Sequence, residues 1–170
     1  SSFPLEEDNP FLGVRGIRFS LAHPEIFVIQ LRALLRANAG LENLQVLFPM
    51  VAKVSEPEEA LELLACAHRE LTEEGQATAK PKVGLMIEVP SAVFLTKALA
   101  ARVDYLSVGT NDLAKELRSP LVPSRHPLVP HLATALLAAR EAGKVILDGV
   151  YNDVRNPEGF VAECRQGMEM

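Results

Sequence analysis

Short apolar runs alternate with longer segments of helical spacing along most of this chain. A short apolar run is typical of a strand that is buried in a sheet. The pattern predicts strands at 44–50 (LQVLFPM), 82–89 (KVGLMIEV), 103–109 (VDYLSVG) and 144–149 (KVILDG). Apolar residues that recur every three or four positions predict helices at 24–40, 55–75, 90–101, 110–118, 130–142 and 156–167. Ser55 with Glu58 three positions later resembles a capping box, which predicts Ser55 as the N-cap of its helix.

The order of these elements predicts the fold class. Strands and helices alternate, which is typical of an α/β protein with a parallel sheet and right-handed crossovers. Four strand–helix units are about half of an eight-unit barrel, and a full barrel takes ~250 residues. The sequence is therefore compatible with an open sheet, with a parallel (β/α) half-barrel of the TIM-barrel type, or with a barrel completed by a second copy.

The chain shows no repeat and no linker, so we expect a single partial barrel domain over 1–170, with 1–8 as a loose lead-in and a turn at 9–13 (NPFLG). An open half-barrel exposes strand edges and a wide apolar face. Self-association covers such a face most simply, and we therefore expect a homo-oligomer.

Composition narrows the range of partners and compartments. The formal net charge is −5, from 17 basic and 22 acidic residues, which argues against nucleic acid or an anionic membrane as a partner. No apolar run reaches the ~18 residues of a membrane span, and no signal-peptide pattern is present, so a cytoplasmic location is expected. Cys66 and Cys164 each fall in a helical pattern and are expected to be reduced, buried thiols.

Two carboxylates mark the carboxyl ends of neighbouring predicted strands, where parallel α/β proteins place their active groups. Glu88 interrupts an apolar strand, and Asp112 follows the next strand just after a glycine turn. A carboxylate in an apolar setting needs a cation or strong donors, and hard oxygen ligands suit Mg²⁺ or Mn²⁺. The alternative is that Asp112 caps the following helix and that Glu88 pairs with a lysine.

Other polar residues lie near the same predicted edge. Asn111 offers an amide that could donate to an anionic substrate oxygen, or it simply starts a helix. Arg15 could form bidentate bonds to a carboxylate or phosphate, or it is a surface arginine. The roles of Arg125, in a proline-rich loop, and of Asp148, at the end of the fourth strand, stay open.

Several motifs carry a family resemblance over residues 9–113. This part closely resembles the C-terminal barrel of Enzyme I of the phosphoenolpyruvate:sugar phosphotransferase system, in its nitrogen-related form. The matching pieces are NPFLGVRGIR, HPEIF, QLRALLRA, LFPM, EEG, VGLMIEVPSAV and VDYLSVGTNDL.

From residue 109 onward the motifs change. GTNDLAKEL, AAREAGKVILDGVYNDVRNPEGF and AECRQG resemble the citrate lyase β-subunit and malyl-coenzyme A lyase family. The motif GTNDL suits both families. The two resemblances imply a chimera or fragment with an Enzyme I-like half at 9–108 and a citrate lyase β-like half at 109–170.

Both resemblances imply that Glu88 and Asp112 hold Mg²⁺ or Mn²⁺. The resemblance to Enzyme I further implies that Asn111 meets the phosphate of phosphoenolpyruvate and that Arg15 grips the substrate. Enzyme I carries a catalytic cysteine in a C-G-E motif at the end of the next strand. This chain has Asp148-Gly149 there, so that proton donor to the enolate is missing, and no catalytic residue is assigned.

Three functions are compatible with these residues. The first is a barrel fragment or chimeric scaffold that binds Mg²⁺ and a small oxo-acid without full catalysis. The second is a phosphoenolpyruvate-dependent phosphotransferase or a citrate or malyl-coenzyme A lyase, completed by oligomerisation. The third is a purely structural scaffold. The missing cysteine favours the first and third, and the intact carboxylates favour the first and second, so we expect the first.

Overall fold

The computed structural model describes residues 15–170. Its strands are β1 (Gln45–Phe48), β2 (Lys82–Ile87), β3 (Tyr105–Val108) and β4 (Val145–Leu147). Its helices are α1 (Ile17–Ala22), α2 (Pro24–Asn38), α3 (Ser55–Glu73), α4 (Pro90–Ala100), α5 (Thr110–Glu116), α6 (Val129–Glu141) and α7 (Pro157–Glu169). The turn predicted at 9–13 and the lead-in predicted at 1–8 lie outside the described residues.

The strands form one parallel sheet in the order β1-β2-β3-β4. Phe48 pairs with Leu85, and Ile87 pairs with Val108, so the carboxyl ends of β1, β2 and β3 lie side by side. Each strand is followed by at least one helix along the chain. The predicted α/β fold with four βα units is therefore confirmed.

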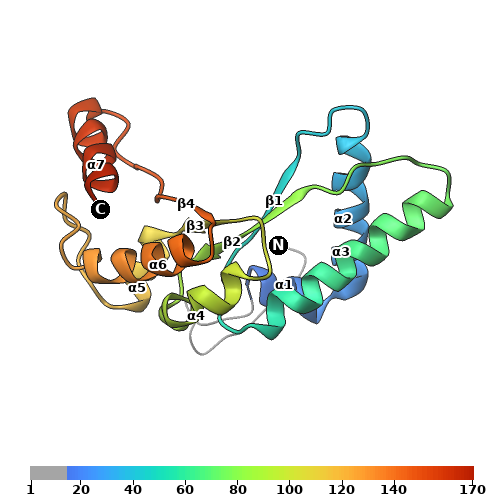
Figure 1. Ribbon diagram of the computed structural model, residues 1–170, viewed down its shortest axis with the longest axis horizontal. Helices are drawn as coiled ribbons and strands as arrows, with labels where there is room; N and C mark the ends of the chain where they lie inside the picture. The colour runs from blue at the N-terminus through green and yellow to red at the C-terminus, as the bar shows by residue number, and fades with distance from the viewer. Residues whose placement is uncertain (1–14) are drawn as a thin grey trace, which may run out of the picture.

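Helices cover one face of the sheet (Figure 1). α2 packs on α3 at one end of the sheet, and α4 packs on α6 at the other. Because side chains alternate along a strand, every second residue of β2 points toward these helices. Val83, Leu85 and Ile87 are buried there, together with Leu31 of α2 and Leu99 of α4. These aliphatic side chains belong to one continuous core between the sheet and the helices.

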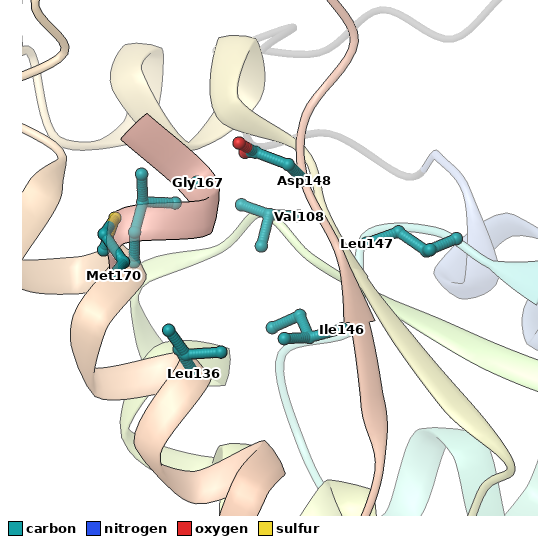
Figure 2. A pocket seen from close by; sticks show the side chains of 8 residues that line it. Val108, Leu136, Ile146, Leu147, Asp148, Gly167 and Met170 are labelled. Carbon is teal, nitrogen blue, oxygen red and sulfur yellow. The ribbon is translucent and has the colours of Figure 1, made fainter. Parts of the chain in front are cut away.

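The opposite face of the sheet is only partly covered by the described elements. Tyr105 lies across Gly84 on this face, where a β-carbon on Gly84 would come within 2.3 Å of the Tyr105 ring. Val145 is 63 % exposed and Leu147 is 51 % exposed on β4. Figure 2 shows that Ile146 points toward α6 whereas Leu147 extends to the other side of the strand. An apolar face of this kind is what an open half-barrel presents.

The structure corrects two details of the sequence analysis, the capping of α3 and the absence of α1 from the predicted helices. Val54, not Ser55, is the N-cap of α3, and no side chain caps that helix. The carboxylate of Glu56 instead accepts hydrogen bonds from the N–H groups of Ala52 and Lys53, because it lies close to the loop that precedes the helix. The short helix α1 was not predicted.

The cysteines are both free thiols, as expected, but the predicted burial was wrong. Cys164 is exposed because α7 contributes no buried residue, and Cys66 is half-buried. Within 15–170, no helix is long and apolar enough to cross a membrane.

Candidate functional site

Glu88 is a buried carboxylate at the carboxyl end of β2. The residue is 3 % exposed, and its Oε1 accepts a hydrogen bond of 2.6 Å from the backbone N–H of Met50. Met50 follows β1, which is the neighbour of β2, and it has a left-handed backbone with φ 59°. The turn after β1 therefore directs one donor at the carboxylate.

The pKa of the Glu88 carboxyl is raised above its ordinary value of 4.5. Burial is the main cause, and the negative charge of Asp112 adds to it. The N–H of Met50 and the positive charge of Arg15 act in the opposite direction without cancelling the shift. The ionised form of Glu88 is thus under-stabilised in the folded protein, which is the condition that a bound cation relieves.

Gly109, at the end of β3, lets the chain approach Glu88 closely. A β-carbon at Gly109 would lie 2.4 Å from Oε2 and 2.6 Å from Cβ of Glu88. The backbone φ of Gly109 is −98°, which any residue adopts, so the requirement for glycine is steric.

Asp112 lies in the first turn of α5, beside the same strand ends. Its Oδ1 is 3.5 Å from a guanidinium nitrogen of Arg15 and 3.9 Å from Nζ of Lys115. Its side chain is 32 % exposed, so solvent or a ligand can reach it. No side chain caps α5, and within 15–170 Glu88 interacts with the N–H of Met50 and with Asp112 and forms no described ion pair with a lysine. The alternatives of a capping Asp112 and a lysine-paired Glu88 are therefore not what the structure shows.

Arg15 is held at this edge by its neighbours. The N–H of Ile17 donates to the carbonyl of Pro49. Gly16, with φ 58°, packs so closely on Met50 that a β-carbon on Gly16 would lie 2.9 Å from the Met50 side chain. The Nε of Arg15 is buried without a hydrogen-bond partner. An anionic ligand oxygen is one group that could satisfy it.

Asn111 precedes Asp112 and contacts the segment after β4. Its Oδ1 accepts a hydrogen bond of 3.0 Å from Nδ2 of Asn152. This contact uses the acceptor of the amide, and within 15–170 its N–H groups have no described side-chain partner. The structure thus gathers Arg15, Glu88, Asn111 and Asp112 at one edge of the sheet.

A divalent cation fits this donor set. Glu88 and Asp112 supply hard oxygen ligands. The described residues contain no group of three or more His, Cys, Asp or Glu side chains suited to a metal, so the protein would supply two carboxylates. Two protein carboxylates with water and ligand oxygens completing the shell is the usual arrangement for Mg²⁺. Glu88 and Asp112 would hold the ion.

Sequence reasoning missed a second polar cluster, around Arg125. This arginine is 5 % exposed, and its Nη1 donates to both carboxylate oxygens of Asp148 at 2.8 and 2.9 Å. Nη1 also contacts Glu163 at 3.2 Å, and Nε donates to Gln166 at 2.8 Å. Glu163 and Gln166 lie one helical turn apart on α7, which was the available signal in the sequence. The cluster attaches α7 to the end of β4.

A small pocket lies between α6, β4 and α7, away from the carboxylates (Figure 2). Its volume is about 70 Å³, and Val108, Leu136 and Ile146 point into it. Asp148 stands at its edge, but its carboxylate already pairs with Arg125. The pocket is therefore a packing gap under α7 and not the candidate site.

Glu88→Gln should change how stability depends on pH. Because the folded-state pKa of Glu88 is raised, the folded protein binds this proton more tightly than the unfolded chain does. Stability therefore falls as the pH rises from about 4.5 through the raised pKa. We expect the free energy of unfolding, measured with urea at a series of pH values, to fall less in Glu88→Gln over this window. Parallel profiles for the two proteins would contradict this.

Comparisons with known proteins identify the family to which this chain belongs. Residues 3–118 match a protein family that is described as PEP-utilising enzyme, PEP-binding domain. The phosphoenolpyruvate-dependent phosphotransferase system protein of Salmonella typhimurium is 46 % identical over 155 residues, which cover 85 % of this chain and 20 % of that protein. The phosphoenolpyruvate-protein phosphotransferase of Bacillus subtilis is 41 % identical over 82 % of this chain and 26 % of its own length.

A solved structure supports the second resemblance. A citrate lyase from Burkholderia xenovorans LB400 aligns with a TM-score of 0.63 and 25 % identity, over 79 % of this chain and 43 % of that one. The two family resemblances and the barrel-type fold are thus confirmed, whereas the division at residue 109 stays a prediction. This chain spans only a fifth to a quarter of the curated relatives described above. By the match over residues 3–118, the chain belongs to the family of PEP-utilising enzymes, within their PEP-binding domain.

Proposed function

We propose that the carboxyl edge of β1–β3 binds phosphoenolpyruvate or a similar small oxo-acid through Mg²⁺ or Mn²⁺. One observation carries the proposal. Glu88 is a buried carboxylate with a raised pKa, and it lies beside Asp112 in a chain of the PEP-binding family. A cation shared by the two carboxylates offsets the unfavourable burial of Glu88.

Each nearby residue has a role in this proposal. Glu88 and Asp112 hold the cation, which polarises the ligand carbonyl or enol oxygen when bound. Arg15, with its unsatisfied buried Nε, donates to the carboxylate or phosphate of the ligand. Asn111 donates through the amide nitrogen that its contact with Asn152 leaves available.

Thermal melting with Mn²⁺ and oxalate tests the proposal. Oxalate stands for the planar oxo-acid, and a ligand at ~100 times its dissociation constant adds about 2.7 kcal/mol to the free energy of unfolding. We expect the melting temperature of the parent to rise and that of Asp112→Ala not to respond. Glu116→Ala, on the same helix, is the matched control and should respond as the parent does. No rise in the parent would remove the basis for a metal-dependent site.

We further propose that this chain on its own binds without turning phosphoenolpyruvate over. Asp148 stands directly after β4, where both oxygens of its carboxylate accept hydrogen bonds from Arg125 and where Enzyme I would have its catalytic cysteine. The second candidate is a phosphotransferase or lyase site completed by self-association, which the exposed Val145 and Leu147 of β4 favour. The relatives bear phosphotransferase names, but this chain covers about a fifth of their length.

Pyruvate release, measured over a range of protein concentrations, separates the two candidates. We expect no release above background at any concentration when Mg²⁺ and phosphoenolpyruvate are supplied. Release that rises more steeply than the protein concentration, together with a dimer in analytical ultracentrifugation, would support the second candidate instead.

A further inference from the structure

A groove lies at the amino ends of the strands, far along the sheet from Glu88. It runs between α3 and the turn after α4, and its volume is about 550 Å³. Its floor is apolar, with Leu64 at 8 %, Val83 at 5 % and Val103 at 5 % exposure. The volume falls within the ~300–1,000 Å³ range of small-molecule sites.

Basic side chains surround this groove. Lys80, Lys82, Arg102 and Lys144 line it, against the single acidic residue Asp104. Across the whole chain the balance is the reverse, with 17 basic and 22 acidic residues. The groove is therefore a local concentration of positive charge on an acidic protein.

Three of the four basic side chains have no ion pair among the described residues. Arg102 pairs with Glu58 at 2.6 Å, but Lys80, Lys82 and Lys144 have no ion pair within residues 15–170. The one acidic group in the lining, Asp104, accepts the N–H of Val83 at 2.8 Å, and its single negative charge offsets one of the three lysines. The groove thus keeps a net positive charge for an anion at the mouth of an apolar hollow.

The place of the groove separates it from the oxo-acid site. Glu88 and Asp112 lie at the carboxyl ends of the strands, whereas Lys82 and Lys144 stand at or just before the amino ends of β2 and β4. In barrels of this type the amino end of the strands ordinarily serves stability alone. A cluster of unpaired lysines does not stabilise the fold, since like charges repel.

We propose that this groove binds a soluble organic anion with an apolar or aromatic body and a phosphate, sulfonate or carboxylate group. The apolar body lies on Leu64, Val83 and Val103, and the anionic group is bound by Lys82 and Lys144. His68 lines the same wall of α3, and its Nε2 is 2.8 Å from the carbonyl of Thr78, which fixes its ring.

1-Naphthyl phosphate is a suitable probe, since it combines an aromatic body with a dianionic head. Its dissociation constant would be measured by NMR titration of the full chain. We expect Lys82→Gln/Lys144→Gln to weaken binding about tenfold, from the loss of two partly exposed charge contacts. Lys53→Gln/Arg155→Gln makes the same charge change at exposed positions away from the groove and should alter the affinity less than about twofold.

Two further measurements decide the location and the chemistry. The amide shifts that respond should be those around Val83 and Val103, and shifts centred on Met50 and Gly109 would overturn the proposal by placing the probe at the oxo-acid edge. Inorganic phosphate and 1-naphthol should each bind more weakly than 1-naphthyl phosphate. Affinity for inorganic phosphate or for 1-naphthol equal to that for 1-naphthyl phosphate would also overturn the proposal. Equal weakening of binding by Lys82→Gln/Lys144→Gln and by the control Lys53→Gln/Arg155→Gln would overturn it as well.

Discussion

Arg125→Met is expected to release α7 from the sheet while the rest of the domain stays folded. Arg125 joins Asp148 to Glu163 and Gln166, and α7 contributes no buried residue of its own. A 13-residue helix without tertiary contacts is marginal in water. Breaking a buried ion pair costs ~3–5 kcal/mol, and we expect about 2–3 here because Asp148 is 38 % exposed.

Hydrogen exchange followed residue by residue would measure this release. A loss of about 2–3 kcal/mol in the local opening free energy speeds exchange of the α7 amides roughly 30- to 150-fold. The amides of β1, β2 and β3 should keep their protection. Arg165→Met, an exposed position on the same helix, is the control and should leave α7 protected. Unchanged exchange of α7 in Arg125→Met would show that other contacts hold the helix.

Gly109→Ala is expected to lower stability and to remove the response to Mn²⁺ and oxalate together. The new methyl would lie 2.4 Å from Oε2 of Glu88, so the carboxylate or β3 must shift. Overpacking of this kind costs about 1–3 kcal/mol. The negative φ of Gly109 accepts alanine, so backbone strain contributes nothing to the loss. Displacement of Glu88 then removes one of the two proposed ligands of the cation.

Gly84→Ala is the matched control for this variant. Its methyl would meet the ring of Tyr105 on the uncovered face of the sheet, at 2.3 Å, and should also destabilise the fold. Because Gly84 is four residues before Glu88 along β2, the metal response should survive. A normal rise in melting temperature for Gly109→Ala, or a lost rise for Gly84→Ala, would contradict the placement of the site.

Strand-end reasoning predicted which residues meet at the carboxyl edge of the sheet, and their roles there stay a prediction. Glu88 and Asp112 stood out because a carboxylate beside an apolar run is costly, and parallel strands bring their carboxyl ends to one edge. The structure brings Arg15 and Asn111 to the same edge. What the spacing could not predict is the turn at Met50, whose positive φ directs the N–H at Glu88.

The Arg125 cluster was missed for a related reason, because the spacing of Glu163 and Gln166 on α7 does not reveal which residue they bind. Arg125 has φ 51° and lies among prolines, which is typical of an exposed loop. Its partners are 23, 38 and 41 residues away along the chain, so no local pattern links them. The burial predicted for Cys164 failed for the same reason, since α7 has an apolar pattern without a core to pack on.

The sequence by itself determined the order of the strands and of the helices other than α1, the parallel sheet and the two carboxylates, because these follow from local periodicity and from the direction of the strands. The tertiary structure alone decided the pKa of Glu88, the burial of Arg125 and the basic groove at the amino ends of the strands. Desolvation and charge pairing depend on which distant segments meet in space. The spacing of residues along the chain does not specify which distant segments meet.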